Sequence, residues 1–293
     1  MARFAFLGTP EMAVGPLRAL VAAGHEITLC ITRPDRRRGR GGTVTPSPVK
    51  EAAVSLGIAV SHSIDDVAMS GADLAVVVAY GRIIPEGLLN LVPMVNLHFS
   101  LLPRWRGAAP VERAILAGDH ETGVCLMRVE AGLDTGPVYA RRAVPVDDEV
   151  DLPTLQRELV EVGSALLVET LARGVAGLPT PRPQQGEPTI AAKVTNEDLH
   201  LHWEDSAVQL NRVVRLGRAW TSFRDHRLGI VKSRPNAEAV DQGLPGTLIG
   251  ASVVTGQGTL SLLEVQPESR SPMPAEDWLR GIRPTEGERL GSE

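Results

Sequence analysis

Residues 96–110 read N-L-H-F-S-L-L-P-R-W-R-G-A-A-P, and this stretch marks the point where a buried strand ends and a loop begins. The largely apolar residues 94–97 predict the end of a strand inside a sheet. Pro103, Gly107 and Pro110 follow within eight residues, so the chain has to leave the sheet there. Sites in parallel sheets form at such strand ends. We therefore expect this loop to border a functional site.

Asn96 and His98 are two residues apart on the expected strand, so their side chains point to the same side and can face one cavity. An amide donor beside an imidazole suits acyl-type transfer, because the amide can hold a developing oxyanion while the imidazole moves a proton. The alternative is that both side chains only cap backbone groups, which is the commoner role of an isolated Asn-x-His pair. The residues around this pair distinguish the catalytic role from the capping role.

Segments of strand and helix character alternate on both sides of this stretch. Strands are expected at 3–7, 26–32, 74–79, 94–98 and 124–129, and helices at 13–23, 49–56, 85–91, 111–116 and 152–173. The alternation predicts an α/β domain with a Rossmann-like, doubly wound and largely parallel sheet. Thr9 as N-cap and Pro10 as the first helical residue predict where the first helix starts. Gly8 is not followed by the other glycines of the dinucleotide fingerprint, so we expect no nicotinamide or flavin cofactor.

The second half of the chain differs in composition. Residues 174–188 contain Pro179, Pro181, Pro183 and Pro188, which predicts an extended linker. Beyond it, a helix is expected at 206–216, followed by short strands at 228–232, 246–249, 251–254 and 259–265. Short strands punctuated by glycine predict a small β-barrel. We expect a first domain at 1–177, a linker at 178–199 and a second domain at 200–293.

The composition is that of a soluble globular protein. The 293 residues are 43% apolar, which is enough for two ordinary domains. No segment approaches the ~18 to 20 apolar residues of a membrane span, and the apolar run at the start is too short for a signal peptide, so we expect a cytoplasmic protein. Cys30 and Cys125 lie in apolar runs and are expected to be buried hydrophobes. No metal-ligand spacing is present, and no metal is expected.

The positive charge is concentrated although the formal net charge is -5, which argues against a generic nucleic-acid binder. The basic residues form two clusters: Arg33, Arg36, Arg37, Arg38, Arg40 and Lys50 in the first, and Arg212, Arg215, Arg218, Arg224, Arg227, Lys232 and Arg234 in the second. Either cluster alone is usually just a solvated face. Two of them on an acidic protein indicate a polyanion bound at a defined place, because phosphate contacts need local charge.

The stretch 96–110, followed by G-L-D-T-G at 132–136, resembles the signature of the formyltransferases that use 10-formyltetrahydrofolate. Three further matches resemble the branch whose acceptor is initiator methionyl-tRNA: G-T-P at 8–10, P-D-R-R-R-G-R-G with P-S-P-V-K between Pro34 and Lys50, and V-V-V-A-Y-G-R-I-I-P at 76–85. The resemblance is dense to about residue 140 and loose beyond it. It implies an OB-like barrel in the second domain, and 10-formyltetrahydrofolate as a consumed co-substrate.

The resemblance also implies roles for individual residues. Asn96, His98 and Asp134 match the catalytic residues of the family, with Asp134 balancing the charge of a protonated His98. The alternative for Asp134 is a turn residue that bonds its own backbone. The folate would lie beside the backbone and apolar side chains of Ser100, Leu101, Leu102 and Pro103, with the pterin deeper, between the loop after Val78 and the loop around Asp134. Phe99 departs from the family pattern, in which many members have a small residue. Because it alternates away from His98, we expect it to pack beneath the site, and the alternative is that it narrows the pocket.

The partner implied by the resemblance is a tRNA. Arg36, Arg37, Arg38 and Arg40 lie in a glycine-containing loop that matches the family's insertion into the acceptor stem, and Arg212 and Arg215 of the second cluster would meet phosphates in the second, tRNA-binding domain. Aromatic residues are only 3% of the chain, so base stacking is not expected to dominate affinity. We expect a monomer with no DNA or membrane partner.

Several other functions remain open at this point. Glycinamide ribonucleotide and sugar amine formyltransferases and the formyltetrahydrofolate hydrolase module share the chemistry, and the arginine loop together with R-W-R-G-A-A-P favours the tRNA branch over them. A non-catalytic RNA-binding protein would use the basic clusters alone. A nucleotide-dependent oxidoreductase is disfavoured by the missing glycine fingerprint.

Overall fold

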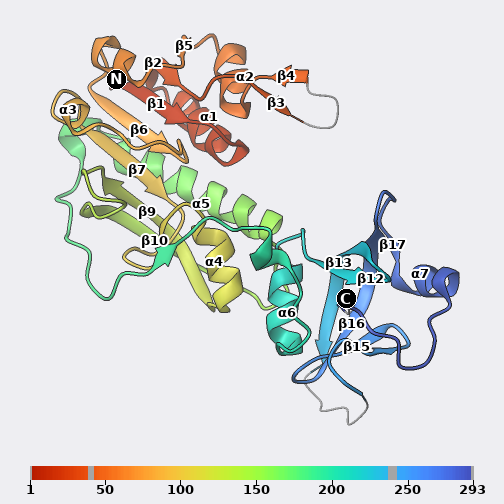
Figure 1. Ribbon diagram of the computed structural model, residues 1–293. Coiled ribbons are helices and arrows are strands. Elements are labelled where there is room, and N and C mark those ends of the chain that lie inside the picture. The colour runs from red at the N-terminus through yellow and green to blue at the C-terminus, as the bar shows by residue number, and fades with distance from the viewer. Residues whose placement is uncertain (1, 39–42, 237–242, 292–293) are drawn as a thin grey trace. The chain divides into compact units, whose positions relative to one another are not determined.

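The computed structural model describes residues 2–38, 43–236 and 243–291 (Figure 1). Its contacts divide the chain into two compact units. The first unit comprises Met1–Val111, Glu121–Pro145 and Leu155–Ala192, and the second comprises Glu112–His120, Val146–Thr154 and Lys193–Glu293. None of the described helices is long and apolar enough to cross a membrane.

A seven-stranded sheet in the order β10-β9-β7-β6-β1-β2-β5 forms the centre of the first unit. The strands are β1 (Arg3–Gly8), β2 (Glu26–Ile31), β5 (Val60–Ser61), β6 (Leu74–Val78), β7 (Met94–His98), β9 (Glu121–Arg128) and β10 (Val138–Pro145). The five from β5 to β7 are mutually parallel, β9 pairs antiparallel with β7, and β10 pairs antiparallel with β9. The predicted Rossmann-like, largely parallel sheet is confirmed.

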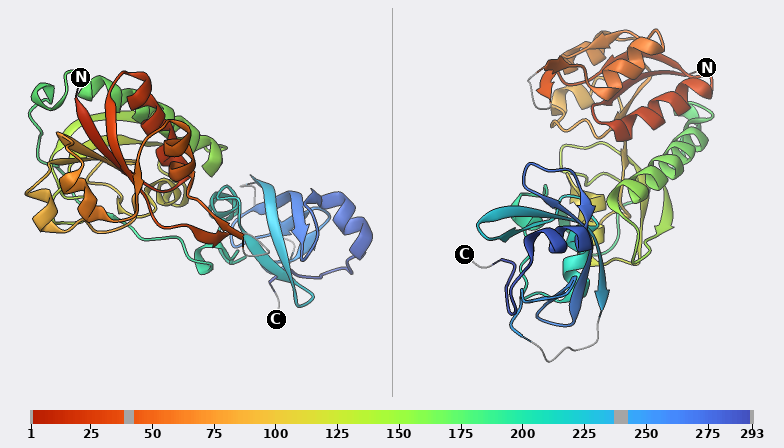
Figure 2. Two further views of the ribbon diagram at one scale, coloured as in Figure 1. Left: turned by 90° about the horizontal axis from the view of Figure 1, so that it is seen from above. Right: turned by 90° about the vertical axis from the view of Figure 1, so that its right-hand side faces the viewer.

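Helices cover both faces of this sheet (Figure 2). The helical segments of this part of the chain are η1 (Glu11–Ala13), α1 (Val14–Ala22), α2 (Pro48–Ser55), η2 (Ile64–Met69), α3 (Glu86–Leu89), α4 (Pro110–Ala117), α5 (Leu152–Leu171) and η3 (Val175–Gly177). On one face, α1 packs against α2 and α5, and α5 in turn packs on β7 and β9. On the other face, Val67 of η2 and Leu88 of α3 pack against Leu7 and Val77 of the sheet.

The predicted start of the first helix, with Thr9 as N-cap and Pro10 as first helical residue, is wrong in detail. Pro10 has an extended backbone and stands before η1, and α1 begins only at Val14 with no side-chain cap. The hydroxyl of Thr9 donates to the carbonyl of Tyr80, at 3.4 Å, rather than to the helix. The sequence pattern does not predict β10, which is an edge strand whose side chains are exposed or half-buried apart from Val144, or the antiparallel pair β3 (Arg36–Arg38) and β4 (Thr43–Thr45).

The second unit is built on a six-stranded antiparallel sheet, which confirms the expected C-terminal β domain. Its strands are β12 (Trp220–Phe223), β13 (His226–Asn236), β14 (Leu248–Ile249), β15 (Ser252–Val254), β16 (Thr259–Pro267) and β17 (Met273–Pro274). Its helical segments are η4 (Glu197–Leu199), α6 (Ala207–Val214) and α7 (Ala275–Ile282). Leu210 of α6 and Trp278 of α7 share one core with Ile230 and Val265 of the sheet. Closure of the strands into an OB-like barrel stays a prediction.

Candidate active site

The site lies where β7 ends and the chain leaves the sheet, as residues 96–110 predict. Asn96 and His98 are on β7, which is bounded by parallel β6 on one side and antiparallel β9 on the other. Asp134 lies in the loop between β9 and β10, with a backbone φ of 49° that is uncommon for a residue other than glycine. Loops from two neighbouring strands therefore meet at the carboxyl end of β7.

Asp134 contacts both of the β7 side chains. The Nδ2 of Asn96 donates to its Oδ1 at 3.3 Å, and the Nδ1 of His98 lies 3.6 Å from its Oδ2. The backbone N–H of Gly107 donates to the same Oδ2 at 2.8 Å. The side chains of His98 and Asp134 are 6% and 13% exposed, so bulk water screens their interaction little. Because all three partners of Asp134 come from other segments, its carboxylate does more than hold its own turn.

The orientation of His98 is set by its other ring nitrogen. Nε2 lies 2.8 Å from the carbonyl oxygen of Trp105. A carbonyl only accepts, so Nε2 carries a proton and Nδ1 is the nitrogen that faces Asp134. Trp105 itself has a φ of 61°, which is strained for a large side chain. The hydroxyl of Ser100 donates to the carbonyl of Arg104 and, at 3.5 Å, to that of Trp105.

The residues expected to line a folate pocket have most of their side chains committed to packing. Ser100 is fully buried, and Leu102 packs in a small core with Cys125 and Met127. Contacts to a ligand from this segment would therefore come chiefly from the backbone. Phe99 is 5% exposed, which fits the expectation that it packs beneath the site. Nothing in its placement shows that it narrows a pocket.

Both cysteines are buried as expected. Burial raises the pKa of the Cys30 thiol to about 12 and that of the Cys125 thiol to about 11. Both thiols therefore stay protonated at neutral pH, which removes them as nucleophiles near the site.

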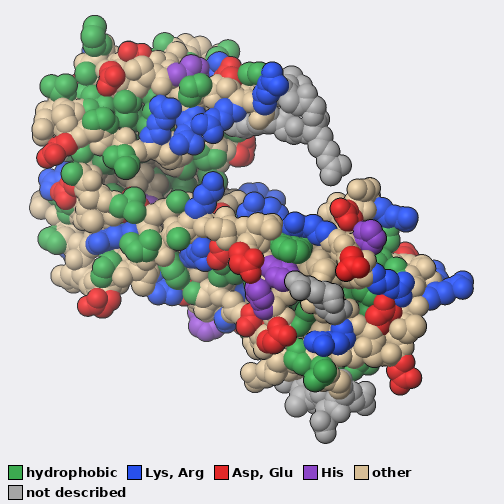
Figure 3. All heavy atoms as spheres, viewed as in Figure 1, with side chains coloured by type: hydrophobic (Ala, Val, Ile, Leu, Met, Phe, Trp, Pro, Cys, Tyr) green, Lys and Arg blue, Asp and Glu red, His purple; other side chains and the backbone are tan. Residues whose placement is uncertain are grey.

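Arg36 and Arg37 of the first basic cluster are exposed on β3. Arg38 ends the same strand, and Arg40 lies outside the described residues. Figure 3 shows Lys and Arg side chains gathered on the visible face of the first unit near β3. The exposed side chains of this strand are therefore accessible to a polyanion, as the sequence analysis expects.

Arg215 of the second basic cluster is placed differently. It is 8% exposed, and its Nη1 donates to the carbonyls of Asp147 at 3.0 Å and Val150 at 3.3 Å. Desolvation by burial lowers the pKa of this guanidinium. The expected phosphate contact finds no support in this placement, because helix α6 turns Arg215 inward. Arg212 is half-buried and donates to Gln209 at 3.1 Å.

Three potential metal ligands come together in the second unit, although the spacing of the chain's His, Cys, Asp and Glu residues does not predict a metal site. One ligand atom from each of Glu197, His200 and His202 lies within 4.8 Å of the others. The ring of His200 is stacked on Trp220, whose ring also lies under the guanidinium of Arg227 at 4.3 Å. This nearby cation disfavours a second positive charge, and none of the three residues belongs to the site around His98.

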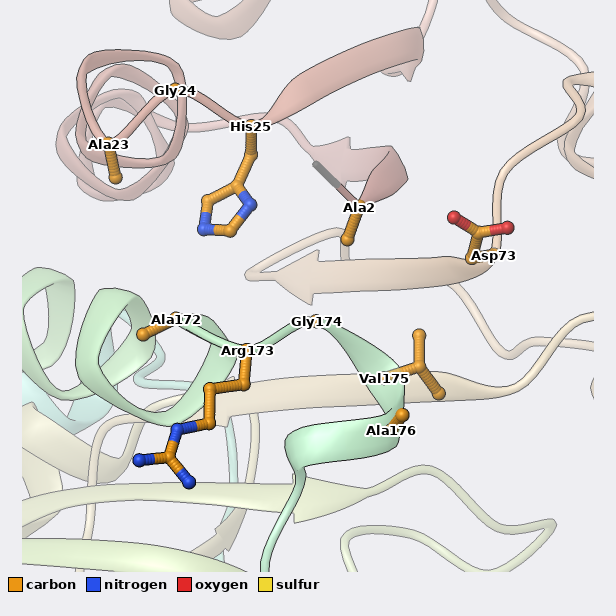
Figure 4. A pocket seen from close by; sticks show the side chains of 10 residues that line it. All are labelled: Ala2, Ala23, Gly24, His25, Asp73, Ala172, Arg173, Gly174, Val175 and Ala176. Atoms are coloured by element: carbon orange, nitrogen blue, oxygen red, sulfur yellow. The ribbon is translucent and has the colours of Figure 1, made fainter.

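A pocket of about 750 Å³ lies elsewhere in the first unit (Figure 4). It is lined among others by Ala2, His25, Asp73 and Arg173. Ala2, His25 and Asp73 immediately precede β1, β2 and β6, so this pocket is at the amino ends of the parallel strands. The Asn96, His98 and Asp134 group lies at their carboxyl ends, where parallel sheets bind ligands.

Comparisons with known proteins agree along almost the whole chain. The family described as formyl transferase matches residues 2–171, and the formyl transferase C-terminal domain matches residues 193–283. The chain is 43% identical to a methionyl-tRNA formyltransferase of Roseobacter denitrificans, with 95% of each chain covered. It is 40% identical to one of Ruegeria pomeroyi, with 98% of this chain and 100% of the relative covered.

The fold has solved counterparts. An N-formyltransferase from Helicobacter canadensis, in complex with folinic acid and dTDP-3-aminofucose, matches with a TM-score of 0.68. The alignment covers 89% of this chain and 99% of that one at 16% identity. At this identity the likeness shows the fold alone.

Proposed function

We propose how the site works on the basis of the family: the chain belongs to the formyl transferase family, on the branch of the methionyl-tRNA formyltransferases. It transfers the formyl group of 10-formyltetrahydrofolate to the α-amino group of methionyl-initiator tRNA, for translation initiation. The observation that carries the mechanism is the contact of Asp134 with both Asn96 and His98.

The reaction exchanges one C–N bond for another. The α-amine of the methionyl ester attacks the formyl carbon on N10 of the folate, which gives a tetrahedral intermediate with a negative oxygen. The N10–carbon bond then breaks, and tetrahydrofolate leaves. One proton moves from the attacking amine to N10, so no oxidant or reductant is needed.

Each of the three side chains has a separate part in this proposal. The Nδ2 of Asn96, which has a second hydrogen beside the one it gives Asp134, and a protonated Nδ1 of His98 donate to the negative oxygen that forms next to them, and this lowers the barrier. The carboxylate of Asp134 balances the charge of His98 and relays the proton, directly or through water. The carbonyl of Trp105 keeps the ring of His98 in the orientation that points Nδ1 at the reaction.

The substrates are proposed to bind through different segments. The backbone of 100–103 borders the formyl end of the folate, and the pterin lies between the loops after Val78 and around Asp134. Arg36, Arg37, Arg38 and Arg40 meet the acceptor stem, and Arg212 contacts phosphates. We also propose that the chain is a cytoplasmic monomer without DNA or membrane partners, which gel filtration and cell fractionation test.

An acceptor comparison tests the proposed function. The protein is incubated with 10-formyltetrahydrofolate and, in separate reactions, charged initiator methionyl-tRNA, charged elongator methionyl-tRNA and a nucleotide-linked amino sugar. We expect formyl-methionine on the initiator tRNA, with the elongator tRNA a poor acceptor and the sugar unchanged. Formylation of the sugar in preference to either tRNA would assign the chain to the other acceptor class.

A further inference from the structure

Residues 182–191, which the sequence predicts to be part of a linker, lie along the candidate active site as an extended strap. At one end, Arg182 and Val138 exchange two backbone hydrogen bonds of 2.8 Å each. At the other end, β11 (Ile190–Ala191) pairs in parallel with β8 (Arg106–Gly107). The strap is thus fixed to β10 and to the catalytic loop, which we define as residues 99–109.

Gln184 joins the catalytic loop to the loop of Asp134. Its Oε1 accepts from the Nε and Nη2 of Arg106 at 3.0 and 2.6 Å. Its Nε2 donates to the backbone carbonyls of Asp134 and Gly136, at 2.8 Å each. The oxygen and the nitrogen of the Gln184 amide therefore both form hydrogen bonds. Together they connect Asp134, which faces His98, to the catalytic loop, whose Trp105 carbonyl orients the ring of His98.

Thr189 holds the catalytic loop at three successive points. Its N–H donates to the carbonyl of Pro103 at 3.3 Å, its Oγ1 accepts the N–H of Trp105 at 2.8 Å, and its carbonyl accepts the N–H of Arg106 at 2.9 Å. The middle contact is to the residue whose carbonyl fixes Nε2 of His98. The strap continues with the carbonyl of Ala191, which accepts from Ala108 at 2.9 Å.

The two loops need such support because their backbones are strained. Trp105 and Asp134 both have positive φ, at 61° and 49°, a conformation that is unfavourable for residues other than glycine unless the surrounding structure compensates. Gly107 has a φ of 121°, and a Cβ there would lie 2.9 Å from the carbonyl oxygen of Ala191. The strap therefore sits so close that glycine is required at the crossing.

We infer that Gln184 and Thr189 are positioning residues for formyl transfer, which hold Asp134 and the Trp105 carbonyl in the geometry that orients His98. The inference rests on the proposed function for its rate effect. Its structural part does not, because the strap would fix the protonated nitrogen of His98 whatever the acceptor. An ordinary linker would connect the two units without setting the geometry of a side chain that it does not touch.

The test compares Gln184→Ala and Thr189→Val with Gln185→Ala, a neighbouring exposed glutamine that serves as the matched control. Thr189→Ser keeps the oxygen that accepts from Trp105 and is the rescue variant. We expect kcat of formyl transfer to fall about 10- to 100-fold in the first two variants, since a displacement of about 1 Å costs this much. KM for tRNA should stay within about twofold, and Thr189→Ser should recover most of the loss.

A second readout needs no substrate. The ¹⁵N chemical shifts of the His98 ring at neutral pH report which nitrogen is protonated. We expect Nε2 to carry a proton in the wild type and in Gln185→Ala, as its contact with the Trp105 carbonyl requires, and its signal to shift or broaden in Thr189→Val and Gln184→Ala. Unchanged ring shifts together with unchanged kcat in both strap variants would overturn the inference. A wild type that shows the Nε2–H form but formylates no tRNA would instead overturn the proposed function alone.

Discussion

The Oδ2 of Asp134 lies 3.6 Å from the Nδ1 of His98, inside a site where both side chains are largely buried. Because Nε2 of the same ring is engaged by the carbonyl of Trp105, Nδ1 is the nitrogen left to gain or lose a proton during a reaction. The N–H of Gly107 donates to the same Oδ2 and holds the carboxylate in place.

Asn96→Ala should lower kcat of formyl transfer by about 10²–10³-fold, because comparable oxyanion donors contribute roughly 3 to 4 kcal/mol to the transition state. The loss should lie in kcat rather than in the affinity for tRNA. Asn90→Ala, which changes an exposed asparagine at the end of α3, is the control. Steady-state kinetics with charged initiator tRNA decide the point. A kcat of Asn96→Ala equal to that of the control would remove the oxyanion role.

The sequence predicts the first unit well because its strands are long, apolar and separated by helical periods. It misses β10 because the side chains of 138–145 are exposed or half-buried apart from Val144 and show no clean alternation. It also misses α7, which is a short amphipathic helix directly after a strand. The hairpin of β3 and β4 escapes notice because its residues are charged or polar and lie among glycines.

The candidate site is only partly visible in the sequence. Asn96 and His98 follow from strand alternation, and Asp134 from the resemblance. Gln184 and Thr189 cannot be found this way, because a proline-rich segment gives no sign of the loops that it crosses. Arg215 is an example of the opposite kind. The sequence places it in a basic cluster, yet at the end of α6 its side chain is buried.

Arg215→Met should lower the free energy of unfolding by about 2–4 kcal/mol, because two carbonyls lose a charged donor in a buried place. The dependence of tRNA affinity on salt should stay unchanged. Arg218→Ala, at an exposed position, is the matched variant: its stability should stay within about 0.5 kcal/mol of the wild type. Urea unfolding and tRNA binding across a salt series measure both effects. A flatter salt dependence in Arg215→Met would return this residue to the tRNA interface.

Arg40→Ala should reduce the discrimination between initiator and elongator methionyl-tRNA, because the expected insertion loop positions the acceptor end. Its salt slope should fall by about one, the value for one lost phosphate contact. Arg280→Ala on α7 removes an exposed arginine that pairs with Asp277 and serves as the control. Formylation rates of both tRNAs are the measurement. Equal selectivity in Arg40→Ala and the control would leave the loop without a role in recognition.

Acid should weaken the second unit through Asp198. The hydrogen bond from Arg113 at 2.8 Å, with further bonds from Thr195, lowers the pKa of this carboxyl to about 2. A carboxyl with a depressed pKa stabilises the fold above its unfolded pKa of about 3.9, and this contribution disappears as the pH falls towards 2. Solvent screening keeps the effect modest. Urea unfolding between pH 5 and 2.5 should show a smaller loss of the free energy of unfolding in Asp198→Asn than in the wild type. An equal loss in the two proteins would show that the Arg113–Asp198 pair does not stabilise the fold.

The single-turnover rate of formyl transfer in His98→Ala and Asp134→Asn, measured with 10-formyltetrahydrofolate and charged initiator tRNA at saturation, tests the role of this pair most directly. His120→Ala, at an exposed position, is the control. We predict a fall of at least about 100-fold in both site variants, with tRNA affinity and the unfolding midpoint near those of the control. Near-full single-turnover rates in either site variant would contradict the claim that the Asp134–His98 pair moves the proton.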